Sequence, residues 1–168
     1  KAAFEDVTGE TSPMYGIDGC SAPNHACTVH GLARAMAFFA SAHDRSDVRS
    51  TAAARLTRAM ATFPEFVAGE TRTCTDLMRA MDHKVAIKTG AEGVYVIAIP
   101  ELGMGAALKC HDGTTRAAEV ACAAQVESLL QQTDSGLSPT EAKALKGFTN
   151  PVLKNRNGIE VGSLRARL

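Results

Sequence analysis

The residues best suited to chemistry are Lys88, Thr89 and Gly90, which end a short apolar segment just before a Gly-containing turn. An ammonium carried by a strand can face a substrate beside a nucleophile, and the adjacent hydroxyl adds a hydrogen-bonding group. The glycine allows a ligand to approach the backbone closely. Three residues are a weak signal, because a surface lysine at the end of a strand has the same pattern. Lys88 is therefore a candidate catalytic residue whose role depends on its surroundings.

A second candidate is the turn Gly16–Cys20, which contains Asp18 and Cys20. Thiolate is a favoured zinc ligand, and Asp18 is close enough in sequence to contact the same centre. The simpler interpretation is a small buried cysteine in a tight turn. A zinc finger built on Cys20, Cys27 and His30 is disfavoured, because no second Cys/His pair follows at finger spacing.

A nucleophile that would work with Lys88 is missing from the sequence. The Lys-Thr-Gly strand of serine β-lactamases and penicillin-binding proteins acts with a Ser-x-x-Lys pair, in which an unprotonated lysine takes the serine proton. No serine here has lysine at the fourth position, and the nearest match is Thr140-Glu-Ala-Lys143, near the wrong end of the chain. The sequence predicts that this chain alone does not complete acyl transfer by that route.

The elements that must position these residues follow from turn composition and apolar periodicity. The segment from Glu5 to Ser21 is rich in Gly, Thr, Ser and Asp and is expected to be a loop. Helical spacing predicts helices from Ala26 to His43, with Asn24 as a cap, from about Asp47 to Phe63, and from Cys74 to Asp82. Short apolar segments between Gly-containing turns predict three antiparallel strands, Lys84–Lys88, Gly93–Ile99 and Met104–Cys110.

A long helix is predicted to follow, from Thr114 or Thr115 to about Gln132, and then a short helix near Pro139 and a basic, extended tail from Asn150 to Leu168. The fold class expected is α+β, an antiparallel sheet covered by the long helix, with the earlier helices forming a separate all-α region. Three strands leave an open edge, so further strands on the amino-terminal side are expected. Residues 1–168 are expected to be a single region, with helices over about 25–83, strands over about 84–110 and a helix over about 114–132.

Composition excludes several classes of protein. The 18 Lys and Arg residues balance 18 Asp and Glu residues, so no overall positive field attracts nucleic acid or anionic lipid. No apolar run approaches the roughly 18 residues needed to cross a bilayer. Five cysteines without a CxxC pair predict a reducing, cytoplasmic location. Since Lys1 opens the chain without a Met or a signal peptide, a processed, tagged or excerpted sequence is expected.

Several blocks of the sequence together resemble one family. The segment Tyr15-Gly-Ile-Asp-Gly-Cys-Ser-Ala-Pro-Asn24 resembles the Asp-Gly-Cys-Ser corner of the metal-dependent, rhizobial-type L-asparaginases, whose fold is similar to that of serine β-lactamases and glutaminases. The resemblance covers nearly all of this chain but only the later half of a full-length member. The other blocks that agree, in the same order, are Pro64–Arg72, Thr75–Met78, Lys88–Gly93, Asp112–Glu119, and Asn150–Pro151 followed by Val161–Gly162.

This resemblance implies hydrolysis of L-asparagine to L-aspartate and ammonia through a serine acyl-enzyme. It implies that Lys88 is the family's strand lysine, which acts in proton transfer or charge stabilisation, and that Cys20 is a zinc ligand. Asp18 would hold the substrate amino group or support the metal. The serine and the remaining zinc ligands would come from a serine-bearing amino-terminal segment or a second chain, and a homodimer is expected.

Two alternatives stay open at the level of sequence. Glutaminase or another amidase activity is a close one, because one methylene in the substrate is worth only about 1–3 kcal/mol of discrimination. A non-catalytic binding or assembly module is the second, since the nucleophile pair is missing. A penicillin-binding role is disfavoured, because the corner at Asp18 has no counterpart in that signature set.

Overall fold

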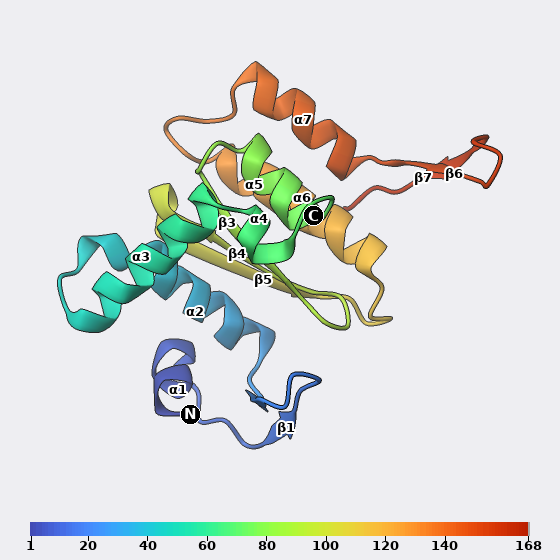
Figure 1. Cartoon of the computed structure of the whole chain (residues 1–168). Helices are drawn as coiled ribbons and strands as arrows, with labels where there is room; N and C mark the ends of the chain where they lie inside the picture. Colours follow the sequence, from blue (N-terminus) through green and yellow to red (C-terminus); the bar gives the residue numbers. More distant parts are fainter. Residues whose placement is uncertain (168) are drawn as a thin grey trace.

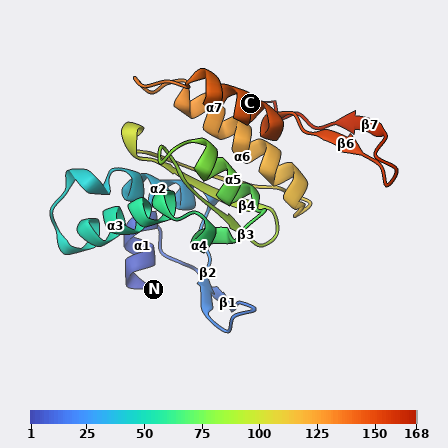
Figure 2. The same ribbon diagram turned by 45° about the horizontal axis from the view of Figure 1, so that its top comes forward.

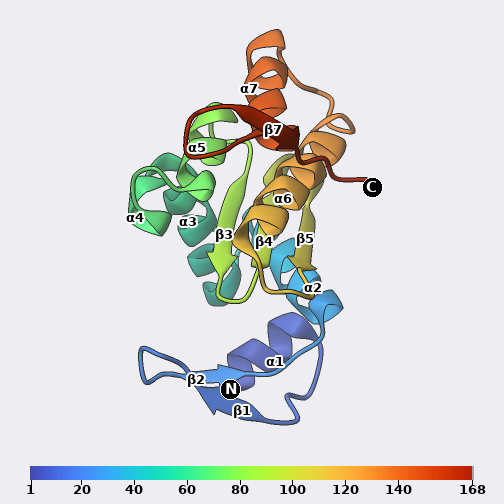
Figure 3. The ribbon, with the colours of Figure 1, turned by 90° about the vertical axis from the view of Figure 1, so that its right-hand side faces the viewer.

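A three-stranded antiparallel sheet lies at the centre of the fold in a computed structural model that describes residues 1–167. Its order is β3 (Ala86–Gly90), β4 (Val94–Ile99) and β5 (Met104–Lys109). Helices α6 (Thr115–Leu130) and α2 (Val29–Ala40) lie on opposite faces of this sheet (Figures 1 and 3). The mixed α and β class and the three predicted strands are confirmed.

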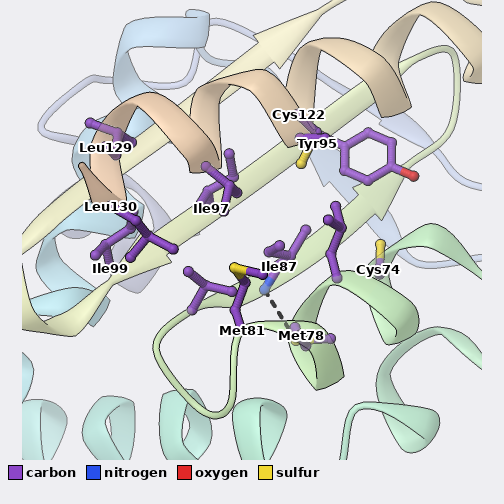
Figure 4. Packing of buried hydrophobic residues seen from close by; sticks show 14 of the residues in the cluster. Cys74, Met78, Met81, Ile87, Tyr95, Ile97, Ile99, Cys122, Leu129 and Leu130 are labelled. Carbon is purple, nitrogen blue, oxygen red and sulfur yellow. Dashed lines mark hydrogen bonds between the residues drawn. The ribbon is translucent and has the colours of Figure 1, made fainter. Parts of the chain in front are cut away.

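One face of the sheet carries the main hydrophobic core. Side chains alternate along β4, so that Tyr95, Ile97 and Ile99 point towards α6 and are fully buried (Figure 4). Helix α5 (Thr73–Ala80) packs beside α6, and the Sδ atom of Met78 accepts a hydrogen bond from the backbone N–H of Ile87 at 3.3 Å. Because α5 contacts β3 and α6 contacts β4 and β5, this core holds all three strands in place.

The opposite face of the sheet carries small residues where α2 packs, and these allow the helix to approach closely. Ala86 and Ala98 are buried against this helix. A Cβ added at Gly105 would overlap the carbonyl oxygen of Ala33 and the backbone nitrogen of Ala37. The prediction that the earlier helices form a separate all-α region is therefore wrong for α2, because a glycine and alanines on the strands leave room for a helix backbone.

The amino-terminal segment contains helix α1 (Ala2–Thr8), so the loop predicted from Glu5 onwards is wrong over its first residues. Glu5 lies 3.5 Å from Lys1 at helical i,i+4 spacing, and Gly9 ends the helix with φ 68°. The Gly, Thr and Ser content of this segment gave the signal for a loop, and the local ion pair and the glycine cap were the competing signals for a helix.

A short hairpin of β1 (Tyr15–Ile17) and β2 (Pro23–His25) follows α1. Asn24 therefore lies in a strand and does not cap α2. The N-cap residue of α2 is Thr28, whose hydroxyl oxygen accepts a hydrogen bond from the backbone N–H of Gly31 at 2.9 Å.

The remaining helices agree with their predicted positions within a few residues. Helix α3 spans Val48–Thr62 and α7 spans Pro139–Thr149, and Thr114 is the N-cap residue of α6, although its hydroxyl bonds Asp112 and not the helix. The sequence did not indicate helix α4 (Glu65–Ala68) or the 3-10 helices Ala42–Asp44 and Pro100–Leu102.

The carboxy-terminal tail is extended, as predicted, and it forms a hairpin of β6 (Val152–Lys154) and β7 (Glu160–Ser163). This hairpin projects away from the other elements (Figures 1 and 2). Leu168, the last residue of the predicted tail, lies outside the described residues. Within residues 1–167, none of the helices has the length and apolar character needed to cross a membrane.

Candidate active site

Lys88 is held near the carboxyl end of β3, on the face of the sheet that also carries Ala86. Its neighbours Ile87 and Thr89 point to the other face, where Ile87 is part of the main core. The strand is therefore packed, whereas the Lys88 side chain is exposed. The Nζ atom donates to the carbonyl oxygen of Thr89 at 2.6 Å. Lys88 therefore offers a positive charge on a rigid strand, open to a ligand.

Uncharged side chains lie directly behind Lys88. Thr89 pairs across the sheet with Tyr95, and Cys74 of α5 lies behind them. Burial raises the pKa of the Cys74 thiol, against the weaker opposing effects of Thr89 and Tyr95, and burial also raises the pKa of Tyr95. Because the thiolate is the nucleophilic form of cysteine, Cys74 is poorly suited to act as the missing nucleophile.

The turn after β3 packs against the turn after β5. Glu92 and Gly93 have positive φ values of 59° and 70°, and a Cβ added at Gly93 would lie 3.0 Å from the carbonyl carbon of Gly113. In the second turn, the carboxylate of Asp112 accepts the N–H of Thr114 at 3.0 Å, which lowers the pKa of Asp112. The fold thus brings together two sequence blocks, Lys88–Gly93 and Asp112–Glu119, that are far apart in the chain.

A third block forms the loop around α4, and Arg79 holds this loop in place. Its guanidinium donates to both carboxylate oxygens of Glu70, at 2.7 and 2.8 Å, and lies 3.4 Å from Glu65. The Thr75 hydroxyl donates to two carbonyl oxygens of the same loop, at 2.6 and 3.2 Å. Arg72, the last residue of the block Pro64–Arg72, is exposed at the start of α5. Arg79 lies just outside the sequence blocks, so sequence reasoning missed this positioning residue.

Asp18 and Cys20 lie at the tip of the β1–β2 hairpin. The backbone N–H of Ser21 donates to the carbonyl oxygen of Asp18 at 2.8 Å, and Ser21 has φ 67°. This turn places the Sγ atom of Cys20 3.8 Å from the Oδ2 atom of Asp18, and both side chains are exposed. The expectation of a small buried cysteine does not hold, because Cys20 projects from a turn that packs against little else.

The donor types at this tip fit zinc, but their number does not. Zinc is held by three or four protein ligands. Within the described part of the chain, no cluster of three or more His, Cys, Asp or Glu side chains that could hold a metal ion is found. Asp18 and Cys20 of one copy therefore supply at most two donors.

The hairpin tip and Lys88 are not joined directly. No hydrogen bond or ion pair links Lys88 to Asp18 or Cys20 among residues 1–167. The hairpin nevertheless lies at the end of the molecule towards which β3 runs (Figures 1 and 3). The two predicted parts of the site share one end of the fold without forming a closed pocket there.

The amidohydrolase class of enzyme is supported by a comparison with known protein families. The sequence profile of the family described as L-asparaginase II matches residues 1–166. The chain therefore belongs to the L-asparaginase II family, which supports an asparaginase-type function with asparagine as substrate. Among curated proteins, none matches the chain.

Proposed function

We propose that this chain supplies part of the active site of an L-asparaginase, which hydrolyses L-asparagine to L-aspartate and ammonia through a serine acyl-enzyme. The nucleophilic serine lies outside the 168 residues, in an amino-terminal segment or in another chain. The observation that carries this proposal is the family match over residues 1–166, together with the absence of a Ser-x-x-Lys pair from the sequence. A β-lactamase-like arrangement of the complete protein and a homodimer are part of the same proposal. The five free thiols support a cytoplasmic location.

The chemistry takes place in two steps at the side-chain amide. The serine oxygen bonds the amide carbon, the carbon–nitrogen bond breaks, and ammonia leaves with a proton. Water then hydrolyses the ester, which releases aspartate and restores the serine hydroxyl. Lys88 acts beside the reacting carbon, where a positive charge on a rigid strand stabilises the developing oxyanion or exchanges a proton with the serine.

Asp18 and Cys20 act at the other side of the substrate in this proposal. The exposed carboxylate of Asp18 binds the α-ammonium group of asparagine, or supports the metal. Cys20 is a zinc ligand, and the remaining ligands come from outside the described residues. Zinc bound there would hold the hairpin in position and polarise nearby oxygen ligands.

The first experiment measures ammonia release from asparagine and glutamine, with and without added zinc, alongside the intact mass of the purified protein. We expect asparagine turnover only when a serine-bearing segment is present, either in a heavier chain or as a co-purifying species. A single species with the mass of this chain and full asparaginase activity would contradict the external serine. A preparation that contains such a segment but releases no ammonia would contradict the enzymatic proposal.

Lys88 has a matched control in Lys109. Both are exposed strand lysines whose Nζ atoms donate to the carbonyl oxygen of the next residue, at 2.6 Å for Lys88 and 2.5 Å for Lys109. Lys88→Ala is expected to abolish turnover, whereas Lys109→Ala should leave it unchanged. If both variants have the activity of the parent protein, Lys88 has no catalytic role.

The zinc proposal is tested with Cys20→Ser, using Cys27→Ser as the control. Cys27 is a half-buried cysteine close in sequence whose thiol pKa is raised by burial and by Glu10. Substitution of zinc by cobalt gives a thiolate-to-cobalt absorption band if sulfur is a ligand. We expect this band to disappear in Cys20→Ser and to remain in Cys27→Ser. A band of unchanged intensity in Cys20→Ser would exclude Cys20 as a ligand.

A further inference from the structure

A groove with a volume of about 840 Å³ lies between α2 and α3. It extends to the end of the sheet where β3 begins and β4 ends. Lys88 does not line it, because the groove reaches the sheet at His83, before the start of β3, and at Pro100, after the end of β4. Apolar side chains, among them Phe39 and Ala61, form part of its wall. Ligand-binding pockets for small molecules usually have volumes of about 300–1,000 Å³ and are mostly apolar.

The charge of this groove is positive although the chain is neutral overall. Arg45, Arg55 and Arg58 line it, and the one carboxylate that also lines it belongs to Glu101. That carboxylate is already engaged, since it accepts the backbone N–H of Ser135 at 3.0 Å and the Ser135 hydroxyl at 2.7 Å. Among residues 1–167 Glu101 forms no ion pair with these arginines, and one carboxylate against three guanidinium groups leaves the lining with a net positive charge.

Two of these arginines have no partner among residues 1–167. Neither the Arg55 side chain nor the Arg58 side chain makes a hydrogen bond or ion pair there, in contrast to Arg49 of the same helix, which pairs with Asp6. Helix α3 contains no Asp or Glu, so neither arginine has an acidic neighbour at i±3 or i±4. Their like charges stand at i,i+3, which is unfavourable on a helix surface. An anion that bridges them would remove this repulsion.

The third arginine is fixed in position. Arg45 donates to the hydroxyl oxygen of Ser50 at 3.0 Å and to the carbonyl oxygen of Phe38 at 3.0 Å, and its guanidinium carbon lies 4.8 Å from the centre of the Phe38 ring. A cation held in this way loses little freedom when a ligand binds. The groove thus combines one immobilised guanidinium with two that are available.

We infer that this groove binds a small organic anion, with its carboxylate or phosphate group on Arg55 and Arg58 and its apolar part against Phe39 and Pro100. Guanidinium groups recognise both kinds of head group through paired charge-assisted hydrogen bonds. The apolar wall accommodates an aromatic or aliphatic body, which a bare inorganic ion does not have. This site is independent of the proposed asparaginase chemistry.

Isothermal titration calorimetry of the purified protein with phenyl phosphate and with benzoate tests this inference. Inorganic phosphate, which lacks the aromatic ring, and benzyl alcohol, which lacks the charge, are the controls. We expect saturable binding of at least one of the two aromatic anions, weaker binding of inorganic phosphate and none of benzyl alcohol. Absence of saturable binding by both aromatic anions would overturn the inference. So would equal binding of benzyl alcohol, because the charge would then have no role, or equal binding of inorganic phosphate, because the apolar wall would have none.

The double variant Arg55→Gln/Arg58→Gln locates the site. Both side chains are exposed, so the fold is expected to be retained, which circular dichroism checks. Loss of charge-assisted hydrogen bonds should weaken binding of the aromatic anion about tenfold or more. The matched control is Arg156→Gln, an exposed arginine between β6 and β7, which should bind as the parent protein does. An unchanged affinity in the double variant would refute the site.

Discussion

The sheet that carries Lys88 and the hairpin that carries Asp18 and Cys20 differ in how they are held. Strands β3 and β4 lie between helices on both faces, with Ile87 and Ile97 fully buried. The hairpin is exposed along nearly its whole length, and among residues 1–167 the hydrogen bonds of its tip are all made within the hairpin itself. One half of the candidate site is therefore preorganised by the core, and the other half depends on local geometry.

This difference indicates which half of the candidate site has to be ordered when a ligand binds. A lysine on a packed strand is already in position, so a ligand has little ordering cost to offset there. An exposed hairpin tip loses conformational freedom when it binds a metal or a substrate. We therefore expect substitutions in the sheet to change stability and substitutions in the hairpin to change binding.

The largest effect is expected from Ile97→Ala in the centre of β4. Ile97 is fully buried, and removal of a buried isoleucine side chain costs about 2–5 kcal/mol of unfolding free energy. Ile17→Ala in the hairpin is the matched control, because Ile17 is 67% exposed and should change stability by less than about 0.5 kcal/mol. Urea unfolding of both variants measures the contrast, and equal losses would show that the hairpin is packed in solution.

A smaller contrast is expected from two glycines in strands. Gly105→Ala places a methyl group against the backbone of α2, at Ala33 and Ala37, and should cost about 1–3 kcal/mol through overpacking. Gly16→Ala in the hairpin meets nothing within 4 Å and should leave stability unchanged or slightly raised. Thermal unfolding distinguishes these outcomes. A tolerated Gly105→Ala would mean that α2 does not lie directly on β5.

The same contrast explains what the sequence could predict. Apolar alternation in β4 and helical spacing in α6 arise from burial, so the strands and the long helix were found close to their observed bounds. Helix α1 was missed, because its ion pair and glycine cap are weak signals beside its loop-like composition. The direct packing of α2 on the sheet depends on Gly105, and no periodicity reports such a contact.

The roles of the candidate site residues stay predictions, and the structure shows only where these residues lie. Sequence blocks indicated Lys88, Asp18 and Cys20, and the structure places the last two side by side. Spacing along the chain could not show that Lys88 stands apart from them, because that separation is set by the packing of elements between them. The cationic groove was not predicted, since Arg55 and Arg58 become significant only when α2 and the start of β3 are placed opposite them.

An intermediate effect is expected at the ion pair that ties the start of β3 to α7. Glu141 is 2.9 Å from the Nζ atom of Lys84 and also accepts the N–H of Ser138 at 2.7 Å. Burial raises the pKa of Glu141, but the Ser138 and Lys84 hydrogen bonds outweigh burial, so the pKa is lowered overall. Glu141→Gln should cost about 1–2 kcal/mol at neutral pH, since a hydrogen-bonded charge is lost.

The pH dependence of this effect follows from the sign of the shift. A lowered pKa in the folded state means that the stabilisation is complete above the ordinary carboxyl value of about 4.3 and is lost as the pH falls through the folded value. The stability difference between the parent protein and Glu141→Gln should therefore shrink in acid. Glu160→Gln on the exposed strand β7, where Glu160 forms no ion pair among residues 1–167, should leave stability at neutral pH unchanged. A constant difference for Glu141→Gln would contradict the ion-pair explanation.

The smallest change in stability is expected from Cys20→Ala and Asp18→Asn at the hairpin tip. Both side chains are exposed, so each substitution should alter the unfolding free energy by less than about 0.5 kcal/mol in the absence of metal. Zinc affinity and asparagine binding should nevertheless fall, because these two side chains are the donors that the tip offers. A large loss of stability without metal would mean that the tip packs against another segment of the complete protein. The hairpin would then be preorganised as the sheet is, and Asp18 and Cys20 would act on a surface already held in place.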